Sequence, residues 1–415
     1  MQQIDTDILI VGGGPAGLSA ALEAEEQGVR NIMIIERDAE LGGILPQCIH
    51  DGFGIHEYGK RLTGPQYAQG YIDRVMESNH ICIKLDTMVL EVTAERVVYA
   101  CNSRDGILRI QAKSIILAMG CRERTAAQVL LYGYRPQGVM TAGSLQRYIN
   151  REGYLPGSRA VILGSGDIGL IMARRMTLEG INVEGVYEKM SSPGGLTRNI
   201  VQCLEDYNIP LHLSTTVVRI HGKYNLEGVT VADIDPQTGK PLDSTKRFIP
   251  CDLLVLAVGL IPENELSRGA GVLIDETTGG PVLDDRFMTS IRGIFAAGNV
   301  AAVFDLVDYV SESGRIAARG AADFVHRESA TEETIMLETS GNIRMVVPQH
   351  IQKEKGQKTV KFFIRVKEPV SGGKLRVMCD GKEVMHKTFA NMLPPEMIVA
   401  EAELDNPEAV CISAE

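Results

Sequence analysis

Residues 7–36 read DILIVGGGPAGLSAALEAEEQGVRNIMIIE and contain the pattern that decides the fold. An apolar run at 7–11 is followed by a glycine-rich turn and by apolar residues at helical spacing, until Gly28 ends the helix. A second apolar run, 31–36, comes next. The stretch predicts a strand, a helix and a second strand in a parallel sheet that is buried on both faces.

The same order of elements returns at 159–188, RAVILGSGDIGLIMARRMTLEGINVEGVYE. Each copy has three glycines in the pattern GxGxxG between strand and helix, and an acidic residue 19 positions beyond the third glycine. These residues are Gly12, Gly14, Gly17 and Glu36 in the first copy, and Gly164, Gly166, Gly169 and Glu188 in the second. Identical spacing in two places is hard to attribute to chance.

The spacing has a physical reason in a dinucleotide site. The first glycine makes a tight turn, the second lets the backbone approach a pyrophosphate, and the third lets the helix pack on the strand. The helix N-terminus holds the phosphates and the acid accepts the ribose hydroxyls. We therefore predict two dinucleotide sites. The neighbouring candidate residues are Pro15, Ala16, Arg37 and Ile168.

The type of nucleotide at the second site depends on Glu188. A carboxylate at this position repels a 2′-phosphate, which favours NAD over NADP, although neighbouring Lys189 could offset part of that repulsion.

The rest of the chain divides around these two copies. From residue 331 onward, apolar and polar residues alternate, and Asp380-Gly381 is typical of a hairpin turn. We predict an α/β fold with two Rossmann-like domains, the second inserted in the discontinuous first, plus a C-terminal antiparallel β-sandwich-like domain. The expected ranges are 1–145 with 275–330, then 146–274, then 335–415. The last range contains no glycine-rich nucleotide turn, paired cysteines or catalytic cluster, so we predict that it docks a partner protein, with cover for an apolar face of the first domain as the alternative.

Composition excludes several classes of function. The 415 residues carry a net charge of −11 without a long basic run, which argues against nucleic acid or an anionic membrane as partner. The longest apolar stretch, Leu253 to Ile261, is too short to span a bilayer. The eight cysteines are at least 19 residues apart, so we expect no metal site. No signal peptide is recognisable, and we expect a cytoplasmic protein.

The whole pattern resembles the family of flavoproteins with two dinucleotide-binding domains that contains glutathione reductase, thioredoxin reductase and NADH oxidases. The resemblance covers about residues 5–327 and rests on GGGPAG with Glu36, SIILAMG, GSGDIG with Glu188, LLVLAVG and TSIRGIFAAGN, in that order. It implies that the first domain binds FAD and the second NAD(P). The further residues that it implies are Gly42, Gly43, Ala118, Gly120, Gly298 and Asn299 for FAD, and Gly259 for the nicotinamide nucleotide.

Two features of the FAD region follow from this resemblance. The segment A-x-G-D that contacts the ribityl chain reads Ala297-Gly298-Asn299 here, with an amide in place of the carboxylate. A helix beginning near Asp305 should point its N-terminus at the flavin pyrimidine ring, with backbone contacts from Val307 and Asp308, because a helix N-terminus stabilises negative charge.

The departures from the family concern the redox cysteines. The disulfide motif CxxxxC is missing after Gly43, where Cys48 stands alone, so dithiol chemistry is not expected. Cys48 could cycle through sulfenic acid, which needs a lowered pKa, or it could be a small buried residue. His50 could be an acid–base group near the flavin or a plain loop residue. Cys48 and His50 are the candidate catalytic residues.

A closer match exists for LGGILPQCIHDGFGIHEYGKRLTGPQYA, LAMGCRERTA and IFAAGNV together. These segments look like a bacterial subgroup found beside glycerol-3-phosphate-dehydrogenase-like flavoproteins. The resemblance implies an FAD-dependent NAD(P)H oxidoreductase that passes electrons to or from a partner flavoprotein or iron–sulfur protein. A free-standing NADH oxidase using Cys48 and a cofactor-holding structural subunit remain alternatives.

Overall fold

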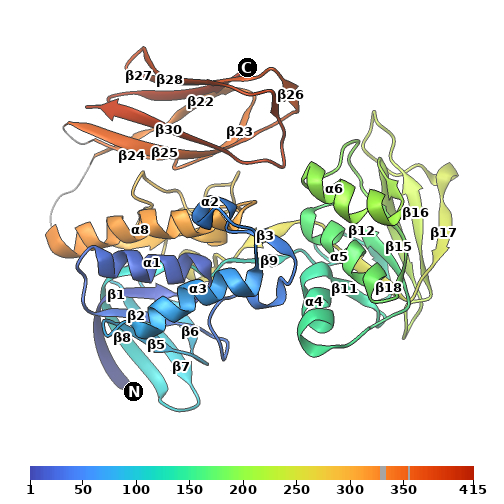
Figure 1. The fold of residues 1–415 in the computed structure, drawn as a ribbon, viewed down its shortest axis with the longest axis horizontal. Helices are drawn as coiled ribbons and strands as arrows, with labels where there is room; N and C mark the ends of the chain where they lie inside the picture. Colours follow the sequence, from blue (N-terminus) through green and yellow to red (C-terminus); the bar gives the residue numbers. More distant parts are fainter. Residues whose placement is uncertain (328–332, 354–355) are drawn as a thin grey trace. The chain divides into compact units, whose positions relative to one another are not determined.

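The computed structural model describes residues 1–327, 333–353 and 356–415, which form two compact units. The first unit contains residues 1–121 and 262–415, and the second contains residues 122–261 (Figure 1). The chain passes from one unit to the other within β9 (Cys121–Glu123) and β19 (Leu260–Pro262). The predicted α/β fold, with one domain inserted in another and a C-terminal β domain, is confirmed.

The boundaries of the inserted domain differ from the predicted ones. Residues 122–145 belong to the second unit, because β11 (Val139–Thr141) pairs with β18 (Leu253–Leu256) in its sheet. Residues 262–274 belong to the first unit, where they pack against its core. Residues 328–330, the end of one predicted range, lie outside the described residues.

A twisted sheet forms the centre of the first unit, in the order β5-β2-β1-β8-β7-β6. The long strand β8 pairs in parallel with β1, antiparallel with β7 through its first half, and in parallel with β20 at its last three residues. The strands are β1 Gln2–Val11, β2 Ile32–Ile35, β5 Ile81–Lys84, β6 Met88–Val92, β7 Val97–Asn102, β8 Gly106–Leu117 and β20 Ile294–Ala296.

Helices α1, α3 and α8 form a layer on this sheet, with α1 in contact with both others (Figure 1). Helix α1 approaches α8 closely because Gly314 has no side chain: a Cβ there would collide with the carbonyl oxygen of Ala16 and with Ser19 Oγ. The elements are α1 Pro15–Glu26, α3 Gly64–Glu77, α7 Glu265–Gly269, α8 Val307–Arg327, and the short α2 Ile55–Tyr58, η1 Leu45–Gln47, η5 Gly298–Val300, β3 Asp51–Phe53 and β4 Leu62–Thr63.

The second unit has a parallel sheet in the order β11-β18-β12-β13-β14 and a smaller sheet in the order β10-β15-β16-β17. Its helices are α4 Ala142–Arg147, α5 Asp167–Leu178 and α6 Thr197–Cys203, with short helices η2 Tyr148–Glu152, η3 Glu205–Tyr207 and η4 Asp243–Thr245. Its remaining strands are β10 Tyr132–Gly133, β12 Arg159–Leu163, β13 Asn182–Tyr187, β14 Leu211–His212, β15 Thr215–His221, β16 Gly228–Asp233 and β17 Arg247–Pro250.

The C-terminal domain packs two main sheets, β22-β31-β27-β28 and β23-β25-β30, around their own apolar core. Its strands are β21 Thr334–Met336, β22 Glu338–Gly341, β23 Ile343–Val347, β24 His350–Gln352, β25 Gln357–Val366, β26 Val370–Ser371, β27 Lys374–Cys379, β28 Lys382–Thr388, β29 Asn391–Met392, β30 Ile398–Asp405 and β31 Val410–Ala414. One pair departs from the predicted antiparallel arrangement. Strands β22 and β31 pair in parallel, which the long connection between them permits.

The C-terminal domain covers an apolar face of the first unit. Phe363 on β25 belongs to the core of that unit, and its ring centroid lies 5.1 Å from that of Phe304 and 6.1 Å from that of Tyr309. Polar contacts accompany these rings: Met397 N donates to Asp305 Oδ2 at 2.8 Å. Covering this face is therefore one role of the domain. A protein-docking role remains a prediction.

Asp284 lies buried beside the C-terminal domain, where its Oδ2 accepts a hydrogen bond from Gln352 Nε2 at 2.7 Å. Burial and the nearby charge of Asp285 raise the pKa of Asp284 to about 7. Asp285 itself pairs with Lys358 at 2.8 Å. Because folding raises the pKa of this carboxyl, the free energy of unfolding of the protein falls as the pH rises from about 4 to 7, by roughly 2–4 kcal/mol.

We expect Asp284→Asn to raise the melting temperature by a few degrees at pH 8 and by less at pH 5, because it removes the cost of a buried charge. Thermal unfolding of the full chain at both pH values measures this. Asp285→Asn is the matched control and should lower the melting temperature, because it leaves Lys358 without its carboxylate partner. A lower melting temperature for Asp284→Asn at pH 8 would contradict the expectation.

Candidate dinucleotide sites

The turn before α1 forms an open cradle in the first unit. Gly14 precedes the helix without any side chain that caps its N–H groups, and a Cβ there would meet only Gly43 Cα, at 3.8 Å. In contrast, a Cβ at Gly12, where φ is +112°, would collide with the carbonyl oxygen of Ala118, and one at Gly17 would collide with that of Gly12. Two glycines are thus needed for packing and the middle one leaves space for a ligand.

The turn before α5 repeats this geometry in the second unit. Gly166 precedes the helix without a side-chain cap, and a Cβ there would meet only the carbonyl oxygen of Ala257, at 3.7 Å. A Cβ at Gly164 would collide with that same oxygen, and one at Gly169 would lie 2.6 Å from Ala257 Cβ. Ile168 lies in the first turn of α5.

The two acidic residues are held by matching backbone contacts. Glu36 accepts from Gly13 N at 2.7 Å and from Asp38 N at 2.8 Å, one on each carboxylate oxygen. Glu188 accepts from Ser165 N and Met190 N, both at 2.9 Å, again one on each oxygen. In both units the donors are the residue after the first glycine of the motif and the residue two places after the acid.

Ser165 adds a hydroxyl at the position where the first unit has Gly13. This hydroxyl donates to Glu188 Oε2 at 2.7 Å and accepts from Gly194 N at 2.8 Å. The fixed carboxylates retain lone pairs for ribose hydroxyls, and the uncapped helix N-termini suit phosphates. Both cradles therefore fit a dinucleotide. The main-chain donors were not predicted, although their equal places in the two repeats could have revealed them.

Most of the other predicted FAD residues surround the cradle of the first unit. Gly42 N donates to Gly13 O at 2.8 Å, and Gly43 lies opposite Gly14. Ala118 lies beside Gly12, and a Cβ at Gly298 would lie 2.8 Å from the Cβ of Ala16. Pro15 opens α1. Gly120, like Gly259 at the end of the matching strand in the second unit, has a positive φ, whereas the Arg37 side chain is exposed.

Asn299 is fixed by contacts within the first unit. Its Oδ1 accepts from Phe304 N at 3.0 Å, and its Nδ2 lies 3.4 Å from Cys121 Sγ as donor. An amide can make both contacts at once, whereas a carboxylate has no N–H to donate. Cys121 was not among the predicted site residues.

The predicted helix after GIFAAGN is present as α8, which begins at Val307. Asp308, in its first turn, is buried, and its Oδ1 accepts from Glu57 N at 2.9 Å. The Asp308 side chain is thus engaged within the protein, which leaves its backbone for the predicted flavin contact.

The two candidate catalytic residues have different surroundings. Cys48 is buried, its Sγ donates to Ile44 O at 3.4 Å, and burial raises the pKa of Cys48 to about 12. The thiol is therefore neutral at pH 7, which favours a packing role over a reactive thiolate. His50 is half-buried, with its ring centroid 5.0 Å from that of Phe53. Its predicted acid–base role stays a prediction.

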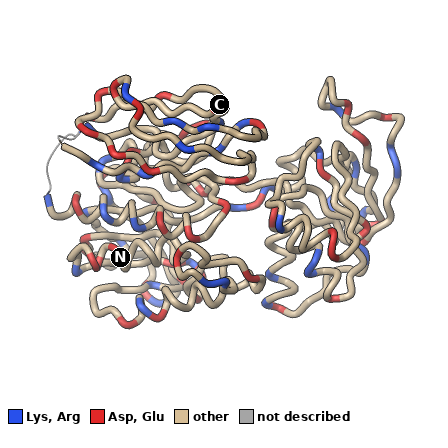
Figure 2. Tube along the Cα trace, turned by 45° about the horizontal axis from the view of Figure 1, so that its top comes forward, with Lys and Arg blue, Asp and Glu red and all other residues tan. Residues whose placement is uncertain are grey.

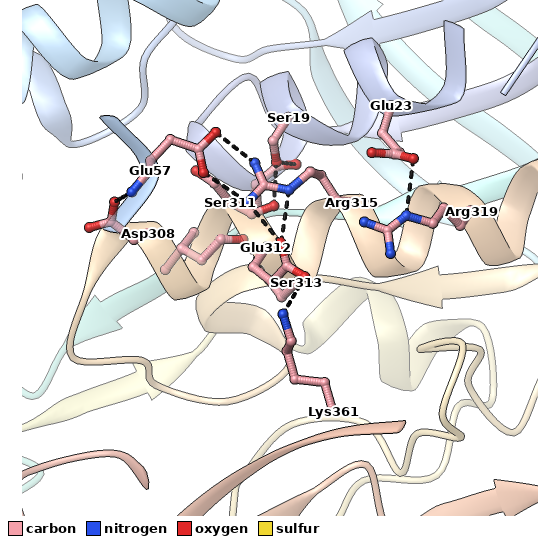
Figure 3. A network of polar contacts seen from close by, with 12 residues as sticks. Ser19, Glu23, Glu57, Asp308, Ser311, Glu312, Ser313, Arg315, Arg319 and Lys361 are labelled. Atoms are coloured by element: carbon pink, nitrogen blue, oxygen red, sulfur yellow. Dashed lines mark hydrogen bonds and ion pairs between the residues drawn. The ribbon is translucent and has the colours of Figure 1, made fainter. Parts of the chain in front are cut away.

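A network of charged side chains beside the first cradle was not predicted (Figure 3). Arg315 on α8 donates to both carboxylate oxygens of Glu57, at 2.9 and 2.8 Å, and to Glu312 at 2.9 Å. Glu312 also accepts from Lys361 of the C-terminal domain, at 2.8 Å. A cavity of about 330 Å³ borders Glu57 and Arg315.

Charge is unevenly divided between the units (Figure 2). The first unit contains 27 Lys and Arg against 40 Asp and Glu, and the second 15 against 13. Among residues 1–327, 333–353 and 356–415, no cluster of His, Cys, Asp and Glu is suited to a metal ion. No helix in the same ranges has the length and hydropathy needed to cross a membrane.

Two Rossmann-like cradles of matching geometry, in two units of one chain, define an oxidoreductase that uses two dinucleotides. The sequence of residues 6–321 matches the family model described as pyridine nucleotide-disulphide oxidoreductase. The chain belongs to this family. Its members, thioredoxin reductase included, use FAD and NAD(P)H, so the predicted enzyme class and cofactors are confirmed at this level. The choice of NAD over NADP stays a prediction.

Three similar proteins illustrate the range of the family. The chain is 29% identical over 280 residues to the HcnB component of hydrogen cyanide synthase from Pseudomonas protegens, covering 64% of this chain and 58% of HcnB. It is 25% identical over 334 residues to one of the subunits of opine oxidase from Agrobacterium tumefaciens, covering 76% and 65%. The crystal structure of T. acidophilum thioredoxin reductase aligns with a TM-score of 0.62 and 26% identity, covering 77% of this chain and 98% of that one. The chain thus spans less than two thirds of the length of the two curated relatives.

Proposed function

We propose that the chain is an FAD-dependent NADH oxidoreductase that works as an electron-transfer subunit beside a substrate-oxidising flavoprotein, such as a glycerol-3-phosphate dehydrogenase. The observation that carries the proposal is the pair of matching cradles, each with its acid held by two backbone N–H groups. The bound cofactors supply the chemistry, a hydride exchanged between nicotinamide and flavin.

In this proposal the chain's own residues bind and orient the cofactors. Glu36 and the N-terminus of α1 hold the adenosine half of FAD, and Glu188 and the N-terminus of α5 hold NADH. The backbone at Val307 and Asp308 supports the flavin pyrimidine ring through the N-terminus of α8.

The partner is inferred from the relatives and from the state of Cys48. HcnB and its opine oxidase counterpart are, by their names, components of larger enzymes. Cys48, the candidate redox cysteine, is a buried neutral thiol, which disfavours the alternative of a free-standing oxidase that uses it.

Anaerobic titration of the purified protein with NADH tests the proposal. We expect stoichiometric bleaching of the flavin absorbance. NADPH should require a much higher concentration, because Glu188 repels a 2′-phosphate. A flavin that NADH does not bleach would support the alternative of a purely structural, cofactor-holding role.

Co-expression with a glycerol-3-phosphate-dehydrogenase-like flavoprotein tests the partner. It should yield a stable complex that reduces NAD when glycerol 3-phosphate is added. Separate elution of the two proteins would contradict this partner.

Substitution of the two acids tests the assignment of cofactors to units. Glu36→Ala should weaken FAD binding at least tenfold, because it removes the ribose acceptor and frees Gly13 N and Asp38 N. Glu188→Ala should raise the KM for NADH about tenfold while the flavin content stays the same. FAD fluorescence on release and steady-state kinetics with an artificial dye measure the two effects. The reverse pattern would contradict the assignment.

A further inference from the structure

Charged groups of the first unit converge on the N-terminal half of α8 (Figure 3). Arg315 grips Glu57 of the short helix α2 with two parallel hydrogen bonds, and Tyr71 of α3 donates to Glu57 Oε1 at 2.9 Å. The Glu57 backbone N–H in turn donates to Asp308 in the first turn of α8. Helix α2 is thus tied to α8 at two points about two turns apart.

The same arginine is linked to the C-terminal domain through Glu312, its neighbour on α8. Arg315 Nε donates to Glu312 Oε2, and Glu312 Oε1 accepts from Lys361 Nζ on β25. The side chains of Arg315, Glu57 and Glu312 are each about one fifth exposed, so water weakens these contacts little. Burial alone would raise the pKa of Glu312, but hydrogen bonds from Lys361 and Arg315 lower it, so the acid is ionised at neutral pH.

Two serines close to these charged residues on α8 connect the helix to the cradle and to the neighbouring helices. Ser313 Oγ accepts from Gly298 N at 2.8 Å, in the segment that packs on Ala16. Ser311 O accepts from Ser19 Oγ of α1 at 2.8 Å, and Ser311 Oγ lies 2.7 Å from Tyr67 OH of α3. A shift of α8 along its axis would therefore disturb the cradle at Gly298 and at α1.

We propose that Arg315 is a positioning residue that couples the docking of the C-terminal domain to the geometry of the first cradle, through the chain of contacts from Lys361 to Glu312, Arg315, Glu57 and Asp308. The inference rests on the proposed function only for the identity of the ligand in that cradle. Bidentate pairing makes arginine hard to replace here, because lysine offers a single charged nitrogen.

Three variants of the full-length chain test the coupling. Arg315→Met keeps the length of the side chain and removes its charge. Arg315→Lys keeps the charge but cannot form the two parallel hydrogen bonds to Glu57. Lys361→Met removes the link between α8 and the C-terminal domain, together with the ion pair that Lys361 forms with Glu401 inside that domain, and leaves the Arg315–Glu57 pair between α2 and α8 in place. Arg319→Met is the matched control on the next turn of the same helix, because Arg319 pairs with Glu23 and is half exposed.

Hydrogen exchange of the apoprotein gives a readout that does not depend on a cofactor. Arg315→Met should speed the exchange of amides 55–58 and 298–310 at least tenfold, Lys361→Met about threefold, and Arg315→Lys should restore part of the protection. Arg319→Met should leave these segments within twofold of the parent chain. Unchanged exchange in Arg315→Met, or no effect of Lys361→Met on residues 298–310, would overturn the proposal.

Binding of FAD separates this inference from the proposed function. We expect Arg315→Met to raise the Kd for FAD about tenfold and to shift the midpoint potential of the bound flavin, measured by equilibration with reference dyes, with partial rescue in Arg315→Lys. Faster exchange with unchanged FAD affinity would support the coupling and contradict the assignment of FAD to this cradle.

Discussion

Gly14→Val is expected to fold like the parent chain and to lose FAD almost completely. Gly14 has φ −79° and ψ −175°, which any residue adopts, and a Cβ there meets no protein atom closer than 3.8 Å. The added methyl groups therefore enter only the space in front of α1, where the pyrophosphate is proposed to lie. Loss of FAD absorbance from the purified protein, with an unchanged circular dichroism spectrum, measures the effect.

Gly166→Val is the matched control in the second unit. Its backbone is equally unstrained, with φ −64° and ψ 157°. This variant should keep FAD and lose its reduction by NADH, at least a hundredfold in rate at a fixed low NADH concentration. Gly17→Ala should instead impair folding, because its Cβ collides with the Gly12 carbonyl oxygen. FAD retained in Gly14→Val would refute the proposed cofactor position.

Ending the chain at Arg327 is expected to cause the second large effect. Without the C-terminal domain, the rings of Phe304 and Tyr309 lose the cover of Phe363, and Asp305 loses the Met397 N–H donor. Exposure of such an apolar face costs roughly 2 kcal/mol per large side chain. We expect aggregation, or a melting temperature lower by 10 °C or more, with FAD binding greatly reduced.

Light scattering and thermal unfolding measure the effect of this truncation. Phe363→Ala in the full chain is the companion variant, because it removes the central apolar contact and keeps the domain. It should lower the melting temperature in the same direction by a few degrees. A truncated chain that stays soluble and binds FAD normally would show that the domain serves only for docking a partner.

The two cradles could be predicted because their geometry depends on local chemistry. Gly12 and Gly164 must adopt a positive φ, and each acid must lie one helix and one strand further along the chain. Short stretches of sequence are therefore enough to predict these sites. Strand β11 carries no such signal. Its three residues join the second unit through pairing with β18, more than a hundred residues later, and the predicted boundary was therefore wrong.

The ion pair between Arg315 and Glu57 was not predicted, for a related reason. Glu57 and Arg315 are separated by 258 positions. Glu57 lies in the segment 41–68 that resembles the bacterial subgroup, but nothing in that segment indicates a pairing with Arg315. Similarly, the presence of Cys48 after Gly43 is visible in the sequence, but the burial that raises its pKa is a property of the fold. Local geometry can be predicted from one sequence, whereas pairings between residues far apart in the chain cannot.

The first unit is built from two separate stretches of the chain, 1–121 and 262–415, which the ribosome makes at different times. Strand β8 leaves the ribosome long before β20 and α8, which complete its pairing and cover α1. At about 5–20 residues per second, the interval is roughly ten to forty seconds. During that time the second unit, whose residues are continuous, can finish folding, while the nascent first unit shows an open strand and an uncovered helix. We therefore expect chaperones to bind mainly to the N-terminal segment of the nascent chain.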